Sequence, residues 1–206
     1  NAHQINEKGE MIQTNYFQYK NVPLVQGKDK LAISRCVGIG CSQIITDNIK
    51  DKMIPFKDEV IAHDWLAAFL ANEGKGMAYI EEPLFGYRLH TNNVFGGRNL
   101  AQNLSRWKKE NGTSYLSYLK YRKEKVIDKA YLEGAKMCLA YVTKEENKVF
   151  LEKLIQYYKS LEKSKYINIH IFSYFKFLAG KNLARKMMKE WMIFHLPILG
   201  YLIYLI

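Results

Sequence analysis

The spacing of hydrophobic and polar residues divides the 206-residue chain near residue 98. Before that point, short apolar runs alternate with turn residues, which is typical of short strands and short helices. After it, hydrophobic residues recur three and four positions apart, as they do in amphipathic helices. The pattern predicts strands over 11–13, 77–80 and 84–87, a β-like segment over 37–45, and helices over 28–35, 47–53 and 61–72. The rest of residues 1–24 is expected to be loop and connector.

The second part of the chain is expected to be almost entirely helical. Asn111, Gly112 and Ser114 form a helix stop followed by a cap, and Thr143 with Glu146 has the spacing of a capping box. Gly180 is expected to break the helix after that. The predicted helices cover 100–111, 115–142 and 143–164, with more helix beyond. We therefore expect an α+β chain of two domains, a mixed part over 1–98 and a helical extension over 99–206.

The final segment, residues 172–206, combines aromatic, basic and apolar side chains. Residues 191–206 are nearly all apolar, but they are interrupted by Pro197 and Gly200 and fall short of the roughly 20 residues that cross a bilayer. A basic stretch beside an apolar one is typical of a segment that lies in the headgroup region of an anionic membrane. The alternative is an amphipathic helix packed on its own domain or in a homodimer interface.

Composition narrows the function class. Hydrophobic residues make up 48% of the chain, which excludes wholesale disorder. The three cysteines, Cys36, Cys41 and Cys138, lack metal-ligand spacing and are expected to be reduced, buried thiols in the cytosol. Residues 1–98 carry 11 basic and 11 acidic side chains, whereas residues 99–206 carry 20 and 9 and so hold the entire net charge of +11. The basic half predicts an anionic partner or, alternatively, a solvated helical surface rich in lysine.

The polar residues with the clearest chemical potential lie between residues 61 and 94. Asp64 stands at the start of a predicted helix, and Arg88 and His90 follow a predicted strand. A carboxylate at a helix start can accept a proton, while an arginine and a histidine can hold an anion or a metal ion. In the plainer alternative, Asp64 is a helix N-cap and the other two are solvated loop residues.

A set of short motifs over residues 37–94 carries a family resemblance. In order they are VGIGC at 37–41, IPF at 54–56, HDW at 63–65, GKG at 74–76, YIEEPL at 79–84 and YRLHTNNV at 87–94. Their order and spacing resemble those of the bacterial family 2 glycosyltransferases, in particular the rhamnosyltransferase-like members that build cell-surface polysaccharide. Residues 1–10 are also similar to the stretch that follows the metal-binding Asp-x-Asp of that family.

The resemblance implies a fold and an activity. The fold is the acceptor-side half of a GT-A-type α/β domain with few strands, followed by the helical extension. The activity is transfer of a sugar, with inversion, from a nucleotide-sugar donor to a saccharide or lipid-linked acceptor at the cytoplasmic face of the cell membrane. Mg²⁺ or Mn²⁺ would serve as cofactor in the intact enzyme.

The resemblance also implies roles for individual residues. Asp64 falls on the catalytic base of the family. His90 would bind the diphosphate or the metal ion, with further metal ligands upstream of Asn1. The other expected substrate-binding residues are His63, Trp65, Gly40 and Arg88. Trp65 is otherwise a core tryptophan, and Arg88 is otherwise a partner of Glu82.

The chain departs from the family in the part that holds the nucleotide. The alternating strands and helices with which the family begins are not in this sequence, and no glycine-rich phosphate loop follows a predicted strand. No Asp-x-Asp occurs in the 206 residues, so we expect a fragment that binds neither a nucleotide-sugar nor a metal ion tightly by itself. The alternative function is a non-enzymatic, basic helical module that binds an anionic membrane or nucleic acid. Glutamates recur among its basic residues, which disfavours nucleic acid as the partner.

Overall fold

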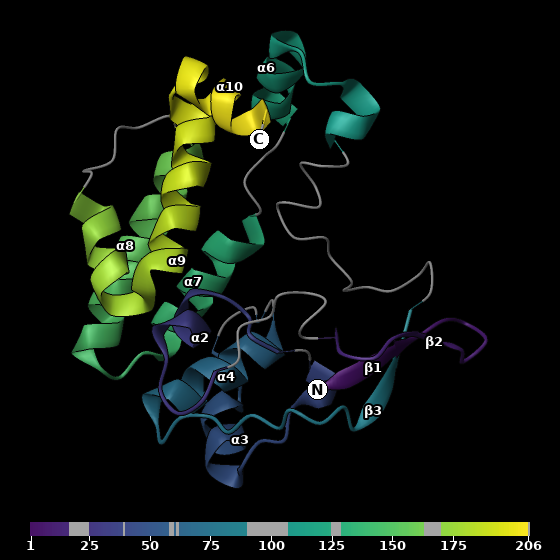
Figure 1. Cartoon of the computed structure of the whole chain (residues 1–206). Coiled ribbons are helices and arrows are strands. Elements are labelled where there is room, and N and C mark those ends of the chain that lie inside the picture. The colour runs from purple at the N-terminus through teal and green to yellow at the C-terminus, as the bar shows by residue number, and fades with distance from the viewer. Residues whose placement is uncertain are drawn as a thin grey trace.

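The computed structural model describes residues 1–16, 25–38, 40–57, 60, 62–89, 107–124, 129–162 and 170–205. The chain is α+β, as expected, with a small three-stranded sheet and a larger helical part (Figure 1). Within the described residues, no helix is long and apolar enough to span a membrane.

The sheet has the order β2-β1-β3. Strand β1 (Ala2–Ile5) pairs antiparallel with β2 (Met11–Gln13) and parallel with β3 (Phe85–Arg88). The β1–β2 turn is closed by the side chain of Asn6, whose Oδ1 accepts from the backbone N–H groups of Lys8 and Glu10 at 3.0 and 2.9 Å. The strand predicted over 11–13 is confirmed, and the one over 84–87 lies one residue later.

Two expectations for the sheet are wrong. Residues 2–5 were expected in a loop, but they form the central strand, because their partner β3 lies more than 80 residues away in sequence and gives no local signal. The strand expected over 77–80 is a single bridge between Gly27 and Met77, with N–H···O distances of 2.7 and 2.8 Å. The backbone of Gly27 approaches Gly76 so closely that a Cβ at Gly76 would lie 2.4 Å from the Gly27 carbonyl carbon.

Helix α4 (His63–Glu73) is the most enclosed element of the first half, since all six residues from Trp65 to Leu70 are buried. Helices α2 (Lys30–Ser34) and α3 (Asp47–Met53) pack against it. Asp29 caps α2 by accepting from the N–H of Leu31 at 2.8 Å. The segment over 37–45 is not β-like as expected. It contains the short 3-10 helix η1 (Gly40–Ser42), and its glycines let it close around the start of α4.

The described part of the second half is mostly helical, as predicted. It contains α6 (Tyr115–Glu124), α7 (Lys129–Tyr141), α8 (Glu145–Glu162), α9 (His170–His195) and α10 (Pro197–Leu205). The predicted stop and cap before α6 are confirmed, because Gly112 has φ +76° and the Ser114 hydroxyl oxygen accepts from the N–H of Ser117 at 3.2 Å. The break expected at Gly180 is wrong, since α9 continues through it.

The start of α8 differs from the expected capping box. Lys144, and not Thr143, supplies the first helical carbonyl, which accepts from the N–H groups of Asn147 and Lys148. The carboxylate of Glu73, at the end of α4, takes the place of the box by accepting from Thr143, Lys144 and Asn147. A residue 70 positions away therefore caps the helix.

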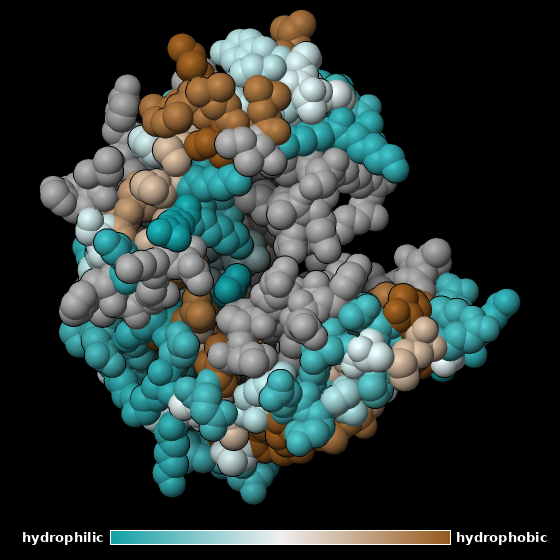
Figure 2. Space-filling view, in the orientation of Figure 1, coloured by the Kyte–Doolittle hydropathy of each residue, from teal (hydrophilic) through white to brown (hydrophobic). Residues whose placement is uncertain are grey.

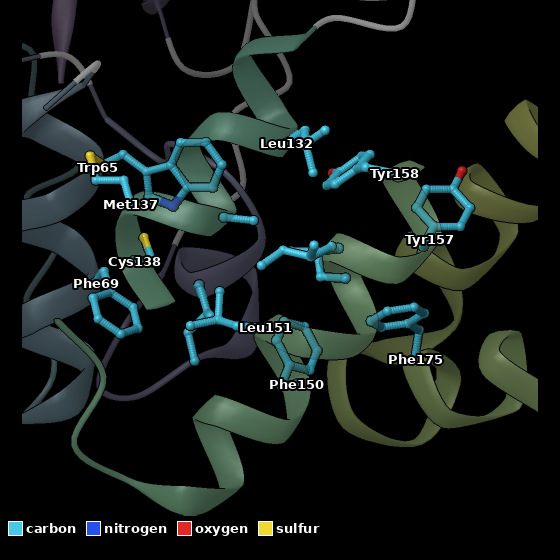
Figure 3. Packing of buried hydrophobic residues seen from close by; sticks show 14 of the residues in the cluster. Trp65, Phe69, Leu132, Met137, Cys138, Phe150, Leu151, Tyr157, Tyr158 and Phe175 are labelled. Atoms are coloured by element: carbon cyan, nitrogen blue, oxygen red, sulfur yellow. The ribbon is translucent and has the colours of Figure 1, made fainter. Parts of the chain in front are cut away.

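The main core lies between α2, α4, α7, α8 and α9 (Figure 3). It contains several aromatic rings in contact, with Phe150 edge-on to Phe175 at a centroid distance of 5.4 Å. A smaller cluster joins α6, the end of α9 and α10 through Tyr118, Tyr121, Ile193 and Tyr204. The main cluster draws side chains from both sides of residue 98. The division into two domains at that residue stays a prediction.

Candidate functional site

Asp64 is the second residue of α4 and lies in its first turn, half-buried. Its Oδ1 accepts from the backbone N–H of Trp65 at 2.9 Å. The N-cap position belongs to Ala62, so Asp64 is not the helix N-cap of the plainer interpretation. A carboxylate at this position can serve as a general base only through its oxygen atoms, one of which, Oδ1, already accepts from Trp65.

The segment over 36–43 closes on the start of α4. A Cβ at Gly40 would lie 2.6 Å from Nε2 of His63, so only a glycine lets the loop approach this closely without moving the imidazole. Gln43 donates from Nε2 to the backbone oxygen of Asp64 at 3.1 Å. The segments VGIGC and HDW, more than 20 residues apart in sequence, are thus in direct contact.

Cys36 contributes a neutral thiol next to this contact. Burial, followed by the negative charge of Asp64, raises the pKa of Cys36 to about 12. The thiol therefore stays protonated at neutral pH and donates to the carbonyl oxygen of Gly38 at 3.0 Å. Nucleophilic catalysis requires the thiolate, so we assign Cys36 no nucleophilic role. The expectation that all three cysteines are buried is wrong, because Cys41 is exposed and Cys36 is only half-buried, whereas Cys138 is buried.

Tyr16 links the sheet to the same loop. Its ring lies edge-on to Tyr87 of β3, with 5.4 Å between centroids. Burial, and then the nearby Tyr87, Cys41 and Cys36, raise the pKa of Tyr16 to about 12. Tyr16 is therefore within electrostatic reach of both Tyr87 and the 36–41 loop. Sequence reasoning did not assign Tyr16, Cys36 or Gln43 to the site. Only the folded chain brings Cys36 and Gln43 to Asp64, and Tyr16 to Cys36 and Cys41.

Arg88 makes a structural contact. Its Nη1 donates to the carbonyl oxygens of Asn6 and Glu7, at 3.1 and 2.7 Å, and so holds the β1–β2 turn against β3. The interpretation of Arg88 as a diphosphate ligand stays a prediction. His90 lies outside the described residues. Among those described, no three histidine, cysteine or acidic side chains are grouped closely enough to hold a metal ion.

Trp65 is a core residue. It is 3% exposed, and its indole packs edge-on against Tyr131 of α7 at a centroid distance of 6.2 Å. Its ring faces are covered by protein in this structure and are not open to a sugar. Trp65 is therefore a core tryptophan, which is the alternative that the sequence left open.

A shallow surface hollow lies elsewhere, on α8. Its lining residues all come from that one helix: Val149, Glu152, Lys153, Ile155, Gln156 and Lys159. Ligand sites typically gather a few polar groups in a concave, mostly apolar pocket, which a hollow along one helix does not provide. The candidate site is therefore the junction of α4 with the 36–43 loop, where Asp64, His63 and Gly40 meet.

Comparison with known proteins adds no assignment: no family model, no curated protein and no solved structure matches this chain.

Proposed function

We propose that this chain is the acceptor-side part of an inverting glycosyltransferase, with Asp64 as its general base. The observation that carries the proposal is the contact between Gly40 and His63. Two motifs that resemble the family 2 glycosyltransferases meet there, and they place a half-buried carboxylate in the first turn of a helix.

The proposed reaction needs a single base. Asp64 accepts the proton of an acceptor hydroxyl as the oxygen attacks the anomeric carbon of the donor, and the bond from that carbon to the nucleoside diphosphate breaks. Attack from the face opposite the leaving group inverts the configuration. A nucleoside diphosphate-sugar is thus the proposed donor, and a saccharide or lipid-linked saccharide of the cell surface is the proposed acceptor.

The neighbours of Asp64 have positioning roles in this proposal. Gln43 holds the first turn of α4 through the Asp64 carbonyl, and the Gly40 backbone limits the positions open to His63. A bound Mg²⁺ or Mn²⁺ would neutralise the leaving diphosphate. The described residues contain no cluster of three histidine, cysteine or acidic side chains that could hold such an ion, and His90 lies outside them, so we assign no step to the metal.

The test is Asp64→Asn in the natural polypeptide that contains this sequence. The amide keeps an oxygen for the N–H of Trp65 but loses its basicity, so we expect turnover to fall about 100-fold or more with the melting temperature unchanged. Asp47→Asn is the matched control, because Asp47 also lies in the first turn of a helix but is exposed on α3. Sugar transfer by Asp64→Asn at the wild-type rate would show that the assignment is wrong.

A further inference from the structure

One end of the molecule presents a continuous apolar surface, which we call the apolar tip. Along α10, Ile198, Leu202 and Leu205 follow one another at helical spacing and are 77%, 54% and 44% exposed. On α6, Leu116 is 77% exposed. Figure 2 shows hydrophobic residues gathered at this end, over α6 and α10. The apolar tip comprises Tyr115, Leu116, Ile198, Leu199, Leu202 and Leu205.

The opposite face of α10 holds these side chains outward. Tyr204 is fully buried, and its hydroxyl donates to the carbonyl oxygen of Gly112 at 3.0 Å. Gly200 lies against Tyr118, where a Cβ would be 2.2 Å from the phenol oxygen. Tyr115 and Tyr201 join the two helices at the surface, with 5.1 Å between ring centroids. Because α10 is held in this way, it cannot rotate to bury its apolar face.

Basic residues border the apolar tip. Lys108 lies 5.3 Å from the ring centroid of Tyr204, and Lys120 lies 5.9 Å from that of Trp107. Lys109 on the same segment as Lys108 is exposed. Residues 107–120 contain three lysines and a single acidic residue, and α10 contains no charged residue. The border is therefore positively charged.

We propose that the apolar tip docks on an anionic lipid surface. The leucine and isoleucine side chains would enter the boundary between headgroups and acyl chains, while the lysines would meet lipid phosphates. A second copy of the chain is a poorer occupant, because a two-fold contact would bring the same positive border against itself. The proposal differs from membrane binding by the whole of residues 172–206, since Phe172 and Phe175 are buried and unavailable to lipid.

The test is co-sedimentation of the chain with vesicles of phosphatidylcholine and phosphatidylglycerol, compared with phosphatidylcholine alone. We expect the double variant Ile198→Glu/Leu202→Glu to bind the anionic vesicles at least about tenfold more weakly than wild type. Ile44→Glu is the matched control, because Ile44 is 98% exposed in a loop outside the apolar tip. Lys109→Glu should lower the affinity for anionic vesicles and make that affinity less dependent on salt. Lys52→Glu on α3 should change neither quantity.

Two results would overturn the proposal. One is wild-type vesicle binding by the double variant, above all if sedimentation velocity shows that the same variant turns a dimer into a monomer. The other is equal binding to vesicles with and without phosphatidylglycerol. The assay contains no donor or acceptor, so its outcome is independent of the role proposed for Asp64.

Discussion

Glu73 shows how much one side chain contributes to this fold. It lies at the end of α4, nearly buried, and its carboxylate accepts from the N–H groups of Thr143 and Lys144 at 2.8 and 2.9 Å. The Thr143 hydroxyl and the Asn147 amide donate to it as well. Burial acts to raise the pKa of Glu73, but the hydrogen bonds outweigh it and hold the pKa below its ordinary value.

The lowered pKa of Glu73 makes the stability of the fold depend on pH. A carboxyl group whose pKa is lower in the folded state contributes stability that is present above its unfolded pKa and is lost as the pH falls through its folded pKa. We expect Glu73→Gln to lower the free energy of unfolding at pH 7 by about 1.5 kcal/mol, allowing for solvent screening. The difference from wild type should shrink below pH 4.

Urea denaturation of both proteins across the acidic range measures this effect. Glu145→Gln is the control, because Glu145 is exposed in the first turn of α8 and pairs only loosely with Lys148, at 3.8 Å. A Glu73→Gln deficit that stays constant down to pH 3 would mean that the charge of Glu73 does not stabilise α8.

At the scale of elements, the contact between α4 and α7 depends on a missing side chain. Gly134 lies inside α7, where a Cβ would stand 1.9 Å from Cζ3 of Trp65. Figure 3 shows the indole of Trp65 between the two helices, beside Met137 and Cys138. Glycine disfavours a helix by about 1 kcal/mol relative to alanine, so it is retained here at a cost to α7.

We therefore expect Gly134→Ala to destabilise the protein by about 2 kcal/mol, because overpacking outweighs the better helix propensity. Trp65→Phe removes the ring that the new methyl group would strike. The double variant should accordingly lose less than the sum of the two single variants, by about 1 kcal/mol or more in a denaturation cycle. Additive single effects, or a Gly134→Ala variant more stable than wild type, would contradict the packing that we describe.

At the scale of the whole molecule, the candidate site and the apolar tip lie at opposite ends. Figure 1 shows α4 and the sheet at one end, α6 and α10 at the other, and α9 extending toward the second end. The core that joins them takes Phe69 from α4, Leu151 from α8 and Phe175 from α9. The proposed catalytic role and the proposed lipid docking can thus be tested separately. Each test substitutes residues that are exposed or half-buried and so leaves the core unchanged.

A further prediction concerns nucleotide-sugar binding by this 206-residue chain on its own. Its described sheet has three short strands, and its sequence contains no Asp-x-Asp. We expect calorimetric titration with nucleoside diphosphate-sugars, in Mg²⁺ or Mn²⁺, to give no heat beyond dilution. Titration with the metal ions alone is the control. Micromolar binding of any donor would show that this chain holds a nucleotide site of its own.

The sequence by itself determined the elements whose signals are local. Helix α3 was predicted at its exact bounds, α4 was predicted to within two residues of each end, and the stop at Gly112 was predicted at its residue. Helical spacing and positive-φ glycines act over one or two turns, so they are visible in a short stretch of sequence. The sequence also singled out Asp64 as a candidate site residue, and the resemblance added Gly40.

Only the tertiary structure decided the features that depend on distant partners. Strand β1 exists because β3 lies beside it, α9 continues through Gly180 although a glycine disfavours helix, and Glu73 takes the place of a capping box. The tertiary structure also assigned Trp65 to the core and put Gly40 against His63. Each outcome depends on hydrogen bonds or packing between residues far apart in sequence, and such energies outweigh local preference without leaving a local pattern.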